Sequence, residues 1–234
     1  MSWLALLLVG VGLCDLLRAA EARAPIPGGS GALVALVGGL LAGLTRAADI
    51  AALVVAAAVV IGWSLVVDRA PRIALLLLAV GLSLAVLLSP YASTADGALG
   101  DWLEATRLPV LHGVSADRAL LLCGSLLVQL ATGNAVVRLV LTLTGSAPLA
   151  TGRTLKGGRL LGPMERLVIL GLGLAGHMTA ASLVIAAKGL IRWPELQSFK
   201  AAGGPSIDEV TEYFLVGSFV SWLLALSTLV LLAR

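Results

Sequence analysis

The sequence predicts an all-α, polytopic transmembrane helix bundle of about seven spans. Of the 234 residues, 59% are hydrophobic and only 12% are charged, whereas a soluble domain has about 45–50% apolar and about 25% charged residues. The apolar residues also come in runs near the ~20 residues that a helix needs to cross a bilayer. Because lipid offers the backbone no hydrogen-bond partners, such runs form helices. This composition excludes a disordered chain, a collagen-like chain, a disulfide-stabilised miniprotein and an ordinary soluble enzyme.

Glycine, proline and charged residues divide the chain into the predicted spans. The connection at 18–31 contains two prolines and three glycines, the sequence DRAPR interrupts the chain at 68–72, and Trp193 and Pro194 mark a later end. The spans are predicted over 2–17, 31–45, 50–67, 73–89, 119–143, 160–190 and 208–232.

The first two spans need separate justification. The first has the hydrophobicity of a signal peptide, but a signal peptide carries its positive charges before the apolar region. Here the first charged residues, Asp15 and Arg18, come at the end of the apolar run. We therefore expect it to be retained as a span, with these two residues paired at its end. The span at 31–45 rises only about 22 Å, less than the ~30 Å hydrocarbon core. Six spans plus a re-entrant hairpin is the alternative.

The chain is predicted to consist of two halves. Residues 1–117 form a glycine-rich transmembrane half that ends in an acidic external connection over about 90–118, where Tyr91 and Trp102 are candidate interfacial anchors. Residues 118–234 form a transmembrane module with buried polar residues. We find no convincing internal repeat in the sequence, which argues against a secondary transporter built from repeats.

Lysine and arginine residues predict the orientation. With the 144–158 loop placed in the cytoplasm, ten basic residues are cytoplasmic and six are external. This predicts a multi-pass membrane protein with its N-terminus outside and its C-terminus in the cytoplasm. The same bias explains the net charge of +3, so no nucleic-acid partner is expected. Membrane lipids are the expected partners, and a membrane-protein partner or a homo-oligomer is left open.

Polar and ionisable residues gather in the last three predicted spans. Exposing a charged side chain to lipid costs at least ~2.5–3.5 kcal/mol, so such residues face the bundle interior or a water-filled cavity. The candidates for ligand binding or buried polar contacts are Asn134, Arg138, Glu165, Arg166, His177, Lys188, Arg192 and Glu212.

A single helix over 160–190 would carry Arg166, His177 and Lys188 as one stripe, because their spacing of eleven residues is close to three helical turns. His177 would lie near the membrane midplane, as a packing residue, a proton relay or a ligand contact. Arg166 and Lys188 would either extend to the two surfaces or pair with acids on neighbouring helices. The span order predicts two charge clusters, an inner one of Arg138, Glu165 and Arg166 and an outer one of Lys188, Arg192 and Glu212.

No metal site or cofactor is expected, and no residue is assigned as catalytic. His177 has no second His or Cys at metal-ligand spacing, and Cys14 and Cys123 stand alone within apolar runs. P-loop, HExxH, CxxC and GxSxG patterns do not occur in the sequence.

Four elements of the C-terminal half follow one another in a distinctive order. They are GNAVVR at 133–138, GPMER at 162–166, LVIAAKGLIRWPE at 183–195 and EYFLVGS at 212–218. In this order, residues 118–232 resemble the C-terminal membrane module of the bacterial family called domain of unknown function 3307. The N-terminal half is not recognised, since it contains no His-x-x-x-Asp-Phe-like element with which such proteins begin. The resemblance points to residues and implies no reaction.

With this resemblance, the sequence predicts a protein of the bacterial inner membrane, not an enzyme, that binds or moves a small or lipidic ligand through a polar site between the fifth, sixth and seventh spans. One alternative is a structural or assembly subunit of a membrane complex that binds its partners through the glycine-rich N-terminal spans. The other is a lipid-modifying membrane enzyme with His177 or Glu165 as its general base.

Overall fold

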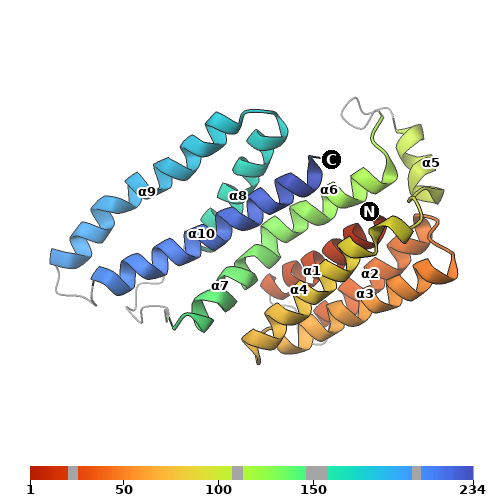
Figure 1. Ribbon diagram of the computed structural model, residues 1–234, viewed down its shortest axis with the longest axis horizontal. Coiled ribbons are helices and arrows are strands. Elements are labelled where there is room, and N and C mark those ends of the chain that lie inside the picture. The colour runs from red at the N-terminus through yellow and green to blue at the C-terminus, as the bar shows by residue number, and fades with distance from the viewer. Residues whose placement is uncertain (21–25, 107–112, 146–157, 202–206, 234) are drawn as a thin grey trace. The chain divides into compact units, whose positions relative to one another are not determined.

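The computed structural model describes residues 1–20, 26–106, 113–145, 158–201 and 207–233 (Figure 1). Within these ranges the chain is all-α and forms nine helices, since α6, η3 and α7 are continuous. The helices are α1 (Ser2–Ala19), α2 (Ile26–Leu41), α3 (Ala47–Val66), α4 (Pro71–Leu87), α5 (Gly97–Ala105), α6 (Ala116–Leu127) with the π-helical η3 (Val128–Thr132) and α7 (Gly133–Leu143), α8 (Gly158–Leu174), α9 (Met178–Ala201) and α10 (Ile207–Leu232). A short 3₁₀ turn, η1 (Ser89–Tyr91), follows α4.

Four helical segments among the described residues are long and apolar enough to cross a membrane. They are Ser2–Ala19, Ala47–Val66, Ala116–Leu143 and Glu212–Leu232. Three shorter apolar segments are Ile26–Leu41, Pro71–Leu87 and Met178–Leu190. The predicted all-α class is thus confirmed, and the number of seven spans stays a prediction.

The chain divides into two compact units, Met1–Thr132 and Gly133–Arg234. The first unit contains α1 to α6 with η3, and the second contains α7 to α10. Helix α6, which was predicted to begin the C-terminal half, packs against α1 in the first unit. The predicted connection over 18–31 is shorter than expected, because α2 begins at Ile26. Helix α2 has Pro27 in its first turn, where the missing N–H of proline costs no helical hydrogen bond.

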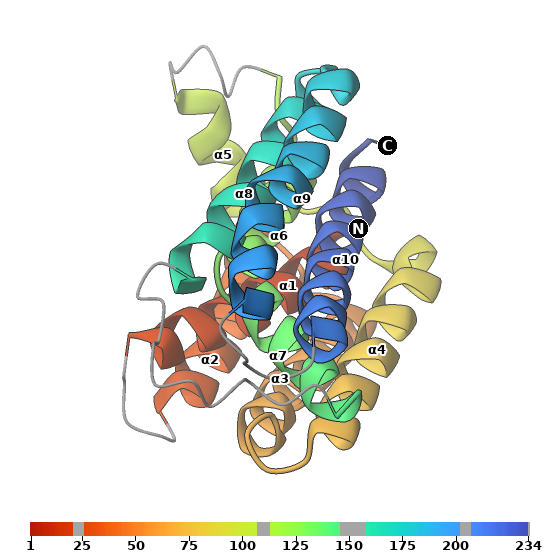
Figure 2. The same cartoon turned by 90° about the vertical axis from the view of Figure 1, so that its left-hand side faces the viewer.

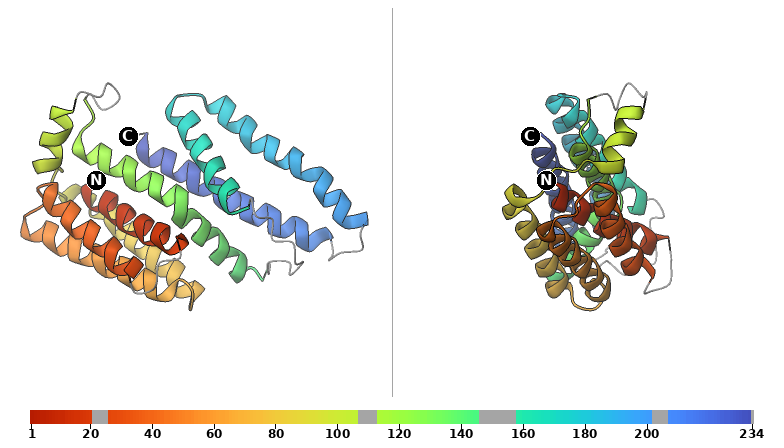
Figure 3. Two further views of the ribbon diagram at one scale, coloured as in Figure 1. Left: turned by 180° about the vertical axis from the view of Figure 1, so that it is seen from behind. Right: turned by 90° about the vertical axis from the view of Figure 1, so that its right-hand side faces the viewer.

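Helix α1 is the centre of the first unit. Thirteen of its eighteen residues are buried, and α2, α3, α4 and α6 all contact it (Figure 3). A helix that is apolar around its whole circumference is typical of a buried position. The predicted first span is therefore the core helix around which the N-terminal unit is built.

Glycines in this unit lie where helix backbones approach closely. A Cβ atom on Gly31 of α2 would lie 2.3 Å from the carbonyl oxygen of Gly10, and one on Gly124 of α6 would lie 2.8 Å from the carbonyl oxygen of Ala5. Both oxygens belong to the backbone of α1, so no side-chain rotation can relieve the overlap. Small residues at these contacts allow the close helix packing that membrane bundles use.

In the second unit, the single span predicted over 160–190 is wrong. The chain forms two helices, α8 and α9, which are separated by a turn at 175–177 and lie side by side (Figures 1 and 2). The N–H of His177 donates to the carbonyl of Leu172, and the N–H of Gly176 donates to that of Gly173. With Gly176 at φ 80°, this is the Schellman motif that ends helices.

The helices of the second unit run alternately up and down. Ile169 of α8, Ala181 of α9 and Ala225 of α10 form its buried apolar cluster. A Cβ atom on Gly173 of α8 would lie 2.5 Å from a Cδ atom of Leu229, one turn further along α10. Helices α8 and α10 are therefore parallel, and α9, which connects them in the sequence, runs in the opposite direction.

Replacing Gly31 by Ala is expected to lower the stability of the protein, because the added methyl group meets the backbone of α1 at 2.3 Å. Overpacking of this kind costs about 1–3 kcal/mol. The matched control is Gly29→Ala in the same helix, where nothing lies within 4 Å of the new methyl group and alanine should stabilise the helix by ~0.5–1 kcal/mol. Thermal unfolding in detergent measures both, and equal melting temperatures would contradict the close packing of α1 and α2.

Candidate functional site

Polar side chains from all four helices of the second unit meet around the middle of α8. We call this set the C-terminal polar cluster. Its members are Asn134 of α7, Glu165 and Arg166 of α8, Lys188 of α9, and Ser221 and Trp222 of α10.

Arg166 is the buried cation of this cluster. Its side chain is among the largest fully buried ones, with 1% of the residue exposed. Nη1 donates a hydrogen bond to Ser221 Oγ at 3.1 Å, and Nη2 donates one to Asn134 Oδ1 at 2.8 Å. A buried charge is tolerated only when hydrogen bonds compensate for the lost hydration. These two bonds therefore connect α8 to both α7 and α10.

Two glycines make room for the Arg166 guanidinium. A Cβ atom on Gly133 of α7 would lie 2.7 Å from Cζ of Arg166, and one on Gly162 would lie 3.3 Å from Oδ1 of Asn134. The guanidinium thus lies directly against the backbone of α7. A side chain at position 133 would therefore force the guanidinium to shift.

Glu165 is the acid of the cluster and contacts two other helices. Oε2 forms an ion pair with Lys188 Nζ, and Oε1 accepts a hydrogen bond from Trp222 Nε1 at 3.0 Å. The ammonium group of Lys188 also lies 5.9 Å from the centroid of the Trp222 ring, within the ~6 Å range of cation–π contacts. The side chains of Lys188 and Glu165 are 25% and 12% exposed, so the pair is largely shielded from solvent.

Adjacent residues on a helix point about 100° apart, and this divides the cluster into two parts. Arg166 forms hydrogen bonds with α7 and α10, whereas Glu165 forms its contacts with α9 and α10. On α10, the successive residues Ser221 and Trp222 receive one contact from each. Both contacts lie at the same level of the parallel helices α8 and α10.

The predicted outer charge cluster is wrong. Lys188 pairs with Glu165, because the turn at 175–177 folds α9 back along α8. Glu212 is exposed, and the side chain of Arg192 lies outside the described part of the chain. Arg138, expected in the inner cluster, is exposed one helical turn beyond Asn134.

His177 does not lie at the midplane of a long helix. It is exposed in the turn between α8 and α9, so the predicted stripe with Arg166 and Lys188 is wrong. Sequence reasoning also missed Ser221 and Trp222. One signal was available, since Ser218, Ser221 and Ala225 are small residues on one face of an otherwise bulky apolar helix.

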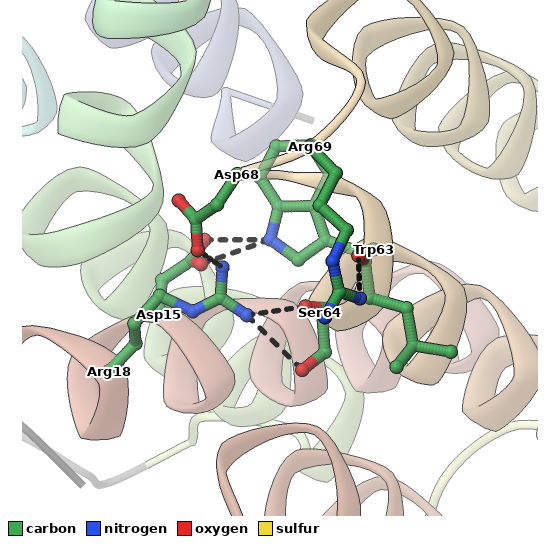
Figure 4. Close-up of polar contacts among 7 residues, drawn as sticks. Asp15, Arg18, Trp63, Ser64, Asp68 and Arg69 are labelled. Carbon is green, nitrogen blue, oxygen red and sulfur yellow. Dashed lines mark hydrogen bonds and ion pairs between the residues drawn. The ribbon is translucent and has the colours of Figure 1, made fainter. Parts of the chain in front are cut away.

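The first unit contains a second set of buried polar contacts, between α1 and α3. Trp3 Nε1 of α1 donates to Asp49 Oδ1 of α3 at 2.8 Å. In the opposite sense, Trp63 Nε1 of α3 donates to both carboxylate oxygens of Asp15 of α1, at 3.0 and 3.1 Å (Figure 4). Each helix thus gives one indole and one carboxylate to the other, near the two ends of a parallel pair.

Neighbouring residues complete both ends of this pair. At one end, Ser93 donates to Asp49 through its backbone N–H at 3.2 Å and its hydroxyl at 2.6 Å. At the other, Arg18 donates to the Ser64 carbonyl at 2.8 Å and forms an ion pair with Asp68 at 3.0 Å (Figure 4). The expected pairing of Asp15 with Arg18 is therefore wrong. Asp15 accepts hydrogen bonds from Trp63 of α3. Arg18 binds Ser64 of α3 and Asp68, which follows this helix.

No group of three or more His, Cys, Asp or Glu residues in the described part of the chain is arranged to hold a metal ion. No protein-family model matches the sequence, and neither a curated protein nor a solved structure is significantly similar to it. The resemblance to domain of unknown function 3307 stays a prediction.

Replacing Trp63 by Phe is expected to destabilise the first unit, because the buried Asp15 carboxylate loses its indole donor. Losing a hydrogen bond to a charged group costs about 1.5–3 kcal/mol. Trp102→Phe is the control, since Trp102 is an exposed tryptophan of α5. If both variants unfold at the temperature of the unaltered protein, the indole–carboxylate contact does not stabilise the unit.

The pairing of Lys188 with Glu165 is testable by a double-mutant cycle. Lys188→Met and Glu165→Gln should each cost between the ~1 kcal/mol of surface pairs and the ~3–5 kcal/mol of buried ones, and the double variant should lose less than their sum. The same cycle with Glu212→Gln serves as the control and should be additive. Coupling of Lys188 to Glu212 in unfolding measurements, with none to Glu165, would contradict the observed pair.

Proposed function

We propose that the chain is a polytopic protein of the bacterial inner membrane that binds or moves a small or lipidic ligand through the C-terminal polar cluster. The observation that carries this proposal is the burial of the Arg166 guanidinium in the middle of an apolar helical unit. Charged residues at such positions are costly and mark ligand sites or transport pathways in membrane proteins.

The chemistry of the cluster supports a binding role. It presents cationic donors on Arg166 and Lys188, an anionic acceptor on Glu165, and neutral partners on α7 and α10. A ligand with a charged group can exchange with one of these internal partners at little cost, since a replacement hydrogen bond is formed. Glu165 lies nine residues, about 14 Å, before the end of α8 at Leu174, and His177 lies in the turn beyond it. A lipid-modifying enzyme with Glu165 as its general base would therefore not use His177 at the same site.

Native mass spectrometry of the complete protein in mild detergent tests this function. The unaltered protein should retain a bound small molecule or lipid. Asn134→Ala removes an acceptor that positions Arg166 and should lower the retained fraction by about tenfold, since a hydrogen bond to a charged group contributes ~1.5–3 kcal/mol. Ser182→Ala is the control, because Ser182 is exposed on α9 and donates only to its own helix. Absence of any retained molecule, or equal retention by both variants, would refute the proposal.

We also propose eight membrane crossings, with both termini outside. If α8 and α9 each cross, the connections that follow α1, α3, α7 and α9 share one side of the membrane. That side receives ten of the basic residues and the other receives four, with Arg166 inside α8 and Lys188 inside α9. The ten are Arg18, Arg23, Arg69, Arg72, Arg138, Arg153, Lys156, Arg159, Arg192 and Lys200. This bias is stronger than the ten to six of the seven-span prediction, and it favours the ten-residue side as cytoplasmic.

Epitope accessibility distinguishes the two topologies. An epitope added after Arg234 should bind antibody without permeabilisation of the inner membrane, because eight crossings return the chain to the outside. The same epitope inserted at Thr151 is the control and should require permeabilisation. A C-terminal epitope that becomes accessible only after permeabilisation, like the one at Thr151, would establish an even number of crossings after Thr151 and contradict the three that the proposal requires.

A further inference from the structure

We propose that Glu165 and Trp222 form a binding site for an ammonium group, and that Lys188 occupies this site as an internal cation when no ligand is bound. The inference rests on the proposed ligand-binding function and names the chemical class of the ligand. That class is a primary amine or a quaternary ammonium compound.

The geometry of the three residues supports this assignment. The Glu165 carboxylate is held in place by the hydrogen bond from Trp222 Nε1 to Oε1 at 3.0 Å. Its other oxygen, Oε2, faces the Lys188 ammonium group, which also lies 5.9 Å from the Trp222 ring centroid. One cation therefore meets a carboxylate and an aromatic ring together, the combination that recognises alkylammonium groups in proteins.

Lys188 is the replaceable member of the cluster. It is the more exposed partner of its ion pair, and its ammonium group sits at the end of a flexible four-carbon stem. Arg166 is not replaceable in this way, because it is fully buried against Gly133.

The charge of the site decides the ligand class. A ligand ammonium that replaces Lys188 preserves the ion pair with Glu165, whereas an anion would place two like charges together in a shielded site. The same ammonium chemistry occurs in free ammonium compounds such as choline and in the headgroup of phosphatidylcholine. The experiment below separates these two sources.

Lysine acetylation of the complete protein measures the displacement of Lys188. Its three lysines are Lys156, Lys188 and Lys200, so two of them serve as internal controls. Tetramethylammonium or choline should raise the acetylation of Lys188 by at least about threefold, because displacement shifts its ammonium from the paired to the free population. Acetylation of the other two should not change, and sodium chloride at the same ionic strength should have no effect.

Variants test the same site independently of acetylation. Lys188→Ala should bind tetramethylammonium about tenfold more tightly than the unaltered protein in thermal-shift titrations, because the competing internal cation is gone. Glu165→Gln or Trp222→Leu, each combined with Lys188→Ala, should abolish this binding. If Lys188→Ala does not fold, the acetylation experiment on the unaltered chain still decides the question.

The two sources of the ammonium group give different results. A response to free choline indicates a soluble ammonium compound, whereas a response only in nanodiscs of phosphatidylcholine, and not of phosphatidylglycerol, indicates a lipid headgroup. If no ammonium compound changes Lys188 acetylation and Lys188→Ala gains no binding, the inference is overturned. Retention of an anionic molecule in native mass spectra would then leave the proposed ligand-binding function standing without it.

Discussion

Reversal of the chain at 175–177 is the constraint on which the C-terminal polar cluster depends. Glu165 and Lys188 are 23 residues apart, and in one straight helix they would lie about 35 Å from each other. The Schellman motif at Gly176 instead folds α9 back along α8 and brings the two side chains into an ion pair. Under the proposed eight-crossing topology, the same reversal also places Arg192 and Lys200 on the side that holds most of the basic residues.

Both units contain buried polar side chains that need hydrogen-bond partners, and each unit meets this need with different residues. Polar side chains buried among apolar helices must obtain their hydrogen bonds from neighbouring helices, since neither lipid nor a packed core supplies them. In the first unit, two indole–carboxylate bonds fix α1 against α3. In the second, the guanidinium of Arg166 and the carboxylate of Glu165 on α8 form hydrogen bonds and an ion pair with α7, α9 and α10. The polar residues thus specify which apolar helices pack together.

Composition and punctuation were sufficient to predict the all-α class and most helix positions, because long apolar runs separated by charge, glycine and proline form helices in lipid. Asn134, Glu165, Arg166 and Lys188 could also be identified as unusual residues within such runs. The side chains that they contact could not be identified from the sequence. The break at Gly176 is one glycine among 27, although a 31-residue run, rising about 46 Å, exceeds what one span needs. The contacts of Ser221 and Trp222 depend on the register of α10 against α8, which no local pattern specifies.

The distance between spin labels at positions 161 and 190 tests the reversal most directly. Leu161 and Leu190 are both exposed, so cysteines there can carry labels once Cys14 and Cys123 have been replaced by alanine. Antiparallel packing of α8 and α9 predicts a distance under about 25 Å, because packed helix axes lie ~8–10 Å apart and the labels extend beyond them. A distance near 44 Å, the rise of one continuous helix over this interval, would contradict the hairpin and the polar cluster that depends on it.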